Sequence, residues 1–261
     1  MKLAEMSITE IRTELERTQE PSAELLAMLR EDQRKGVQAL YKQIEQRAAK
    51  KAMLEAKWNE MNRFEHAQRQ AGKRYIVGID EVGRGPLAGP VVACAVVLPE
   101  ELVLPGLDDS KKVPVAERNR LYERIVAEAT SVGIGTVDAE RIDQINILEA
   151  TKEAMKLAIA AISVPIDVCL IDAVTLPNLP FEQVPIIGGD AASVSIAAAS
   201  IVAKVTRDRL MEEYARQYPQ YSFEKNAGYG TKEHLAAIEA YGPSPIHRRS
   251  FTGVKEWVTG E

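Results

Sequence analysis

The sequence predicts an α/β fold in which helices flank a mixed β-sheet, preceded by a helical N-terminal extension. Two observations lead to this fold class. Residues 1–72 show helical spacing of apolar positions and no strand-like run. The rest of the chain alternates short β-branched runs with long helical patterns, in the order strand, strand, strand, helix, strand, strand-like run, helix. That order is typical of a mixed sheet covered by helices.

The extension begins with a capping-box spacing at Ser7–Glu10, is interrupted at Pro21, and continues helically until Gly72. We therefore predict a helical extension over residues 1–72 and an α/β domain, with a helical C-terminal segment, over residues 73–261. The densely charged face of the extension is that of solvated helices, or alternatively one that binds nucleic acid or a partner.

The α/β domain has five predicted strands and two long predicted helices. The strands are short, apolar and mostly β-branched, and they cover residues 74–80, 90–99, 131–137, 168–174 and 184–190. Helical spacing extends over residues 145–162 and again over residues 193–218.

Composition narrows the class of protein. The 261 residues are 46% hydrophobic, which suits one sizeable domain with an appendage. The net charge is −5 and is unevenly spread: residues 1–73 hold 14 Lys and Arg against 12 Asp and Glu, which leaves 19 of the 33 basic and 26 of the 38 acidic residues for positions 74–261. An acidic domain can still bind a polyanion if it holds cations or clusters its basic groups.

The expected location of the protein follows from what the sequence lacks. No apolar stretch approaches the roughly 18 residues of a membrane span, and the charged N-terminus does not resemble a signal peptide. Both cysteines, Cys94 and Cys169, lie in apolar runs. We expect a cytoplasmic monomer with reduced, buried cysteines and no membrane contact.

Acidic residues close three of the apolar runs, and they are the main functional signal. Asp80 and Glu81 follow the first run, Asp172 lies in the fourth, and Asp190 closes the fifth. If these strands are neighbours, the four carboxylates meet at one edge of the sheet, where α/β folds place ligands. Such a group repels itself unless hard cations neutralise it, and oxygen ligands favour Mg²⁺ or Mn²⁺. Two such ions are a device for phosphodiester chemistry, so a metal-dependent phosphoryl-transfer enzyme is predicted, with residues 73–261 as its catalytic domain.

Candidate substrate contacts surround this edge. The turn Gly83-Arg84-Gly85 brings backbone close to a ligand and could read a ribose 2′-hydroxyl. Tyr229 lies between two glycines, where its ring is available to pack on a sugar or base. Lys204 and Arg207 are on the helix that follows Asp190; they belong either to a solvated helix face or, as we prefer, to a phosphate-binding surface. The scattered histidines indicate no zinc site, and we assign no role to His247.

Four segments together resemble bacterial ribonuclease HII. They are GIDEVGRGPLAGPVV, LIDA, GGDAASVSIAAASIVAKVTRD and GYGTKEHLAAIEAYGPSPIHRRSF, and they cover roughly residues 74–252 in consistent order. The resemblance implies a ribonuclease H-like fold, two divalent ions during catalysis, and cleavage of the RNA strand of RNA–DNA hybrids. It also implies cuts on the 5′ side of ribonucleotides embedded in duplex DNA, leaving 3′-hydroxyl and 5′-phosphate ends.

The same resemblance implies roles for individual residues. Asp80, Glu81, Asp172 and Asp190 match the metal-binding catalytic acids of the family. The turn Gly83-Arg84-Gly85 matches the segment that recognises the ribonucleotide at an RNA–DNA junction, and Tyr229 matches the tyrosine that packs on the next sugar. A DNA-directed nuclease of the same fold, or a hybrid-binding protein without catalysis, are the alternatives. The first has no evident need for the glycine-arginine-glycine turn, and the second would have lost one or more of the acids.

Overall fold

The computed structural model describes residues 3–18 and 21–258, which form two compact units. The first unit is Met1–Lys57 and the second is Trp58–Glu261. The division falls inside a long helix rather than at the predicted boundary between residues 72 and 73. By compactness, therefore, the last part of the predicted extension belongs with the catalytic domain, and the boundary at 72 stays a prediction.

The first unit is helical, as the sequence indicates. Its elements are a 3₁₀ turn and three helices: η1 (Leu3–Glu5), α1 (Ile8–Arg17), α2 (Ala23–Glu31) and the greater part of α3 (Lys35–Met61). The predicted capping box is confirmed, because the Ser7 hydroxyl accepts from the Glu10 N–H while the Glu10 carboxylate accepts from the Ser7 N–H. Ser22 caps α2 in the same manner through the Leu25 N–H.

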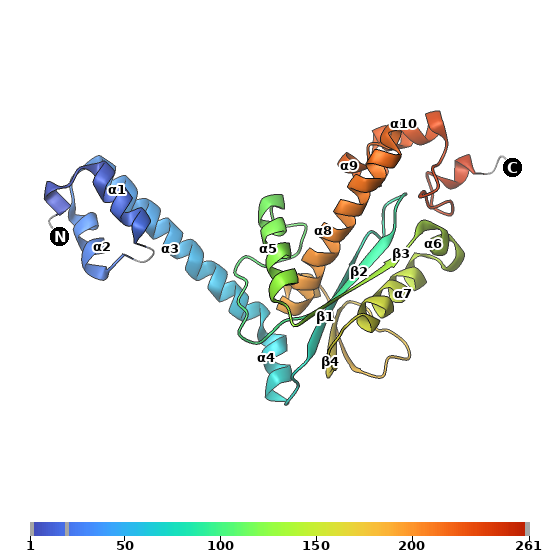
Figure 1. Cartoon of the computed structure of the whole chain (residues 1–261), viewed down its shortest axis with the longest axis horizontal. Helices are drawn as coiled ribbons and strands as arrows, with labels where there is room; N and C mark the ends of the chain where they lie inside the picture. The colour runs from blue at the N-terminus through green and yellow to red at the C-terminus, as the bar shows by residue number, and fades with distance from the viewer. Residues whose placement is uncertain (1–2, 19–20, 259–261) are drawn as a thin grey trace. The chain divides into compact units, whose positions relative to one another are not determined.

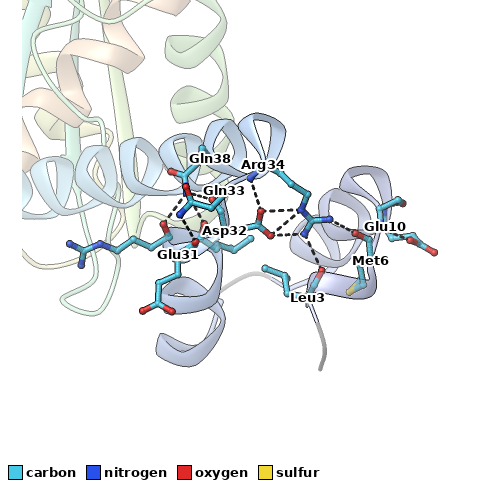
Figure 2. A network of polar contacts seen from close by, with 11 residues as sticks. Leu3, Met6, Glu10, Glu31, Asp32, Gln33, Arg34 and Gln38 are labelled. Atoms are coloured by element: carbon cyan, nitrogen blue, oxygen red, sulfur yellow. Dashed lines mark hydrogen bonds and ion pairs between the residues drawn. The ribbon is translucent and has the colours of Figure 1, made fainter.

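Arg34 holds the start of the chain to the corner between α2 and α3, as Figure 2 shows. Its guanidinium donates to the carbonyl oxygens of Met6, at 2.6 Å, and Leu3, at 3.1 Å, and pairs with Asp32 at 2.6 Å. Beneath this network, buried side chains from all the elements form a small core: Leu3, Ile11, Leu25, Leu29, Val37 and Leu40. The unit thus has a core of its own.

The second unit is built on the predicted mixed sheet. Over the described residues its five strands are β1 (Ile76–Val82), β2 (Val91–Val97), β3 (Ser131–Val137), β4 (Val168–Asp172) and β5 (Glu182–Ile186). They lie in the order β3-β2-β1-β4-β5. The pairs β1–β2 and β2–β3 are antiparallel, whereas β1–β4 and β4–β5 are parallel. The parallel half brings the ends of β1 and β4 to one edge, where the acids lie.

Helices cover both faces of this sheet. Figure 1 shows α8 (Val194–Gln217) crossing one face, with α5 (Val115–Glu128) beside it, and α7 (Ile147–Ala160) lying against the other. The remaining helices are α4 (Arg63–Gln70), α6 (Ala139–Ile145), α9 (Phe223–Asn226) and α10 (Lys232–Tyr241). A Cβ at Gly78 would meet the backbone of Ser195, so glycine in β1 allows α8 to approach the sheet closely. In the described part of the chain, no helix is long and apolar enough to cross a membrane.

Three details of the catalytic domain differ from the sequence prediction. Helix α5 was not anticipated between the second and third strands. The expected helix over residues 145–162 forms as α7, two residues shorter at each end, but the separate helix α6 before it was not anticipated; Asn146, with a φ of 68°, ends α6 and caps α7 through its side chain. Strand β5 ends at Ile186, so Asp190 lies in a short 3₁₀ turn, Gly189–Ala191, rather than at a strand end.

The end of the predicted extension takes part in the catalytic core. Trp58 and Met61 belong to the buried cluster between the sheet, α5 and α8. Glu65 on α4 is 1% exposed, and its carboxylate accepts hydrogen bonds from the Ser193 hydroxyl and the Ser195 N–H at the start of α8. Because a buried carboxylate is costly unless it is hydrogen-bonded, these contacts tie α4 firmly to the N-terminus of α8.

The two cysteines are core residues, as predicted. Cys94 on β2 and Cys169 on β4 are buried and free of disulfide bonds in the described structure. Burial raises the pKa of both thiols, that of Cys169 to about 12. Since the thiolate is the reactive form, neither cysteine is a nucleophile at neutral pH.

Candidate active site

Asp80 is the most deeply buried of the four predicted acids. It lies within β1 opposite Cys94 and is 5% exposed. Burial raises the pKa of Asp80 well above its ordinary value, and the charges of Glu81 and Asp172 add to the rise, while a hydrogen bond with Ser200 on α8 opposes it. A carboxylate in this position is strained electrostatically unless a cation or a proton accompanies it.

Glu81 follows Asp80 on β1 and is only partly matched by its neighbours. Arg84 pairs with its Oε1 at 3.3 Å, but Oε2 is buried without a hydrogen-bond partner. Burial raises the pKa of Glu81, and the charge of Arg84 opposes that rise. An unpartnered, buried carboxylate oxygen has lost its hydration without compensation, so Glu81 Oε2 is a candidate ligand for a cation.

Asp172 and Asp190 approach the same edge from β4 and the 3₁₀ turn after β5. Ile79 on β1 pairs with Ile171 on β4, so Asp80 and Asp172 occupy the next positions of two parallel neighbours. The Oδ1 atom of Asp172 accepts from the Gly189 N–H at 2.7 Å, which fixes the turn that carries Asp190. Burial raises the pKa of Asp190, and the charges of Asp109 and Asp172 raise it further.

The loop between β2 and α5 adds residues that the sequence did not single out. It places Asp109 and Lys111 close enough to Asp190 to act on its charge. In the same loop, the Ser110 hydroxyl lies 3.0 Å from the hydroxyl of Ser200, the residue that is hydrogen-bonded to Asp80. In the sequence, the only indication of these residues is the polar run Asp108-Asp109-Ser110-Lys111-Lys112, which resembles an ordinary surface turn.

The acids do not form a ready-made cage. Among residues 3–18 and 21–258, no group of three or more Asp, Glu, His or Cys side chains is placed so that it could hold a metal ion as it stands. The four predicted acids nevertheless share one edge, and the charge of Asp172 raises the pKa of each of the other three. With the unpartnered Glu81 Oε2 and the buried Asp80, this donor set fits hard divalent cations.

The glycine-arginine-glycine turn lies directly beside Tyr229. Gly83 has a φ of 93°, which favours glycine, and a Cβ at Gly85 would lie 3.6 Å from the Tyr229 ring. Tyr229 itself is 46% exposed, and Arg84 is exposed as well. The structure therefore brings together the turn and the aromatic ring that the sequence indicated separately.

The two basic residues predicted on α8 have different surroundings. The Lys204 ammonium pairs with Asp208 at 2.5 Å and is partly exposed. Arg207 is 1% exposed, and its guanidinium donates to the backbone carbonyls of Pro90, Ala227 and Ala88. A side chain so enclosed cannot reach a phosphate, so the structure argues against Arg207 as a substrate contact. The Arg207 guanidinium binds the protein's own backbone instead.

Known proteins similar to this chain give a consistent picture. Residues 77–254 match the family model described as Ribonuclease HII, and residues 7–69 match that of the Ribonuclease HII N-terminal domain. The chain is 52% identical to the ribonuclease HII of Enterococcus faecalis, over 98% of this chain and 100% of the relative. It is 50% identical to that of Bacillus subtilis, over 97% and 98%. The crystal structure of the ribonuclease H2 from Pyrococcus horikoshii OT3 matches with a TM-score of 0.59 and 25% identity, covering 69% of this chain and 95% of that one.

Proposed function

This chain belongs to the ribonuclease HII family and is a metal-dependent endoribonuclease, and on that premise we propose that it cuts two kinds of substrate. One is the RNA strand of RNA–DNA hybrids. The other is duplex DNA that contains an embedded ribonucleotide, cut on the 5′ side of that nucleotide to leave 3′-hydroxyl and 5′-phosphate ends. The observation that supports this most directly is the position of the acidic edge beside the turn and Tyr229.

We assign the four acids to the binding of two Mg²⁺ or Mn²⁺ ions. When bound, such ions activate the attacking water and neutralise the charge that develops on the scissile phosphate. Asp80 supplies a buried carboxylate beside Ser200, and Glu81 supplies the oxygen that lacks a partner. Asp172 and Asp190 complete the donor set, held together by the bond from Gly189.

Substrate selection is assigned to the neighbouring turn and ring. The backbone of Gly83-Arg84-Gly85 is close enough to the acids to meet the 2′-hydroxyl next to the scissile phosphate. The ring of Tyr229 would then pack on the following sugar, where an extra hydroxyl would be unfavourable. Selection for a ribonucleotide followed by DNA would result.

The test is cleavage of three labelled duplexes that differ only in sugar: DNA with one ribonucleotide, a long RNA–DNA hybrid, and plain DNA. We expect magnesium- or manganese-dependent cleavage of the first two, a single 5′ cut in the first, and no cleavage after chelation with EDTA. Cleavage of plain DNA would identify a DNA-directed nuclease. Binding of the hybrid without cleavage in either metal would identify a non-catalytic binding protein, and either result would contradict the proposal.

A further inference from the structure

Two buried arginines lie beneath the residues proposed to read the substrate. Arg207 comes from α8, and Arg248 follows the buried His247 near the C-terminus; they are 1% and 0% exposed. Buried cations are normally paired with carboxylates. Here each guanidinium nitrogen that makes a described hydrogen bond donates it to a backbone carbonyl.

The carbonyls that accept these bonds belong to the two candidate recognition segments. Arg248 donates to the oxygens of Gly83, Arg84 and Gly89. Arg207 donates to those of Ala88, Pro90 and Ala227. Five of these six carbonyls belong to the connection between β1 and β2, and the sixth, that of Ala227, lies two residues before Tyr229. The fork of donors on an arginine is what allows one side chain to fix three carbonyls at once.

Backbone hydrogen bonds join the same segments and show how closely they pack. The N–H of Leu87 donates to the carbonyl of Gly228, and the N–H of Arg248 donates to the carbonyl of Leu87, both at 2.8 Å. A Cβ at Gly83 would collide with the Arg207 side chain, and one at Gly228 would collide with the Ala88 carbonyl. The turn, the Tyr229 segment and the C-terminal segment therefore cannot shift independently of the two arginines.

We propose that Arg248, together with Arg207, is a positioning residue that sets the spacing between the Gly83-Arg84-Gly85 turn and Tyr229. It thereby determines the selectivity for a ribonucleotide followed by DNA. The inference rests on the proposed function, because it assigns the reading of the junction to those two elements. Each carbonyl oxygen has a second lone pair, so the bonds from Arg248 leave the turn able to accept from a 2′-hydroxyl.

The experiment compares Arg248→Met and Arg248→Lys with the unchanged protein. For each, kcat and KM are measured on DNA with one ribonucleotide and on a long RNA–DNA hybrid. The ratio of interest is kcat/KM on the single-ribonucleotide duplex divided by kcat/KM on the long hybrid. We expect Arg248→Met to lower this ratio by about tenfold or more, because a small misplacement of a recognition group is costly. Lysine keeps the charge but not the fork, so Arg248→Lys should shift the ratio in the same direction by a smaller factor.

Controls separate positioning from stability. Leu121→Ala removes a fully buried side chain from α5, in a different part of the core. It should lower stability and leave the ratio unchanged. If Arg248→Met does not fold, the test uses Arg248→Lys and Arg207→Lys, because each replaces one forked guanidinium by an ammonium group. A ratio that stays at the original value in folded Arg248 variants would overturn the inference. So would an equal shift in Leu121→Ala, or full restoration of the ratio by lysine.

The failure of this inference is distinguishable from that of the proposed function. If the unchanged protein cleaves neither substrate, the proposed function fails whatever the variants do. If it cleaves both and the Arg248 variants keep its ratio, only the positioning role is wrong.

Discussion

His234 and His247 form a buried, hydrogen-bonded pair that makes the stability of this protein depend on pH in a defined direction. The Nδ1 atom of His247 accepts from the Ser244 N–H at 2.9 Å, so its Nε2 carries the proton and donates to the Nε2 of His234, also at 2.9 Å. His234 must then donate from Nδ1 to the carbonyl of Tyr229. A proton added to either ring would place two N–H groups face to face, or leave a buried charge unpaired.

The size of the effect follows from the pKa of His247. Burial, and then the neighbouring His234, lowers that pKa from 6.5 to about 4. Between these values the unfolded chain binds a proton that the folded chain does not, so stability is complete above about pH 6.5 and falls as the pH falls towards 4. At pH 5 the loss from His247 is about 2 kcal/mol, from about 1.5 units at about 1.36 kcal/mol each. Burial lowers the pKa of His234 as well, which acts in the same direction.

The assay is urea unfolding at pH 7 and pH 5, with the change in unfolding free energy compared among three proteins. His247→Gln cannot take up the proton, so its free energy should fall by about 2 kcal/mol less than that of the unchanged protein. His66→Gln, at an exposed position on α4, is the matched control and should keep the original pH dependence. If His247→Gln and the unchanged protein lose equal stability between the two pH values, the pair is not the source and the reasoning is wrong.

Three further predictions concern the site and the domain boundary. Asp80→Asn should abolish magnesium-dependent cleavage and leave the melting temperature equal or higher, because carboxylate repulsion is relieved; near-normal activity would rule out metal binding by Asp80. Tyr229→Ala should lower cleavage at a single ribonucleotide about tenfold to hundredfold, from a loss of about 1–3 kcal/mol of packing, and long hybrids less; equal losses on both would place junction reading elsewhere. A chain that starts at Lys73 should keep its kcat but have an unfolding free energy about 3–5 kcal/mol lower than that of a chain that starts at Trp58, because it lacks Trp58 and the hydrogen bonds of Glu65. Equal unfolding free energies, or a lower kcat in a folded protein, would contradict this.

Features that depend on neighbours along the chain could be predicted from the sequence. The strand over residues 131–137 was predicted with its observed bounds, and the capping box at Ser7 forms as expected. The acidic residues near the ends of apolar runs indicated one site on the condition that their strands are neighbours, and the parallel pairing of β1 and β4 meets that condition for Asp80 and Asp172. Side-chain periodicity, caps and turn residues are local properties, so they are readable without the fold.

The tertiary structure decided the partners of each charged side chain. In the sequence, Lys204 and Arg207 are equivalent basic residues on one helix, yet one is partly exposed beside Asp208 and the other is enclosed among carbonyls. Likewise, Ser110 reaches Ser200 only through the path of a long loop. A charge is inexpensive in water and costly in the interior without partners, and those partners here lie far away along the chain. Only the packed structure therefore shows which basic side chains are free to contact a substrate and which are held by the backbone of the protein.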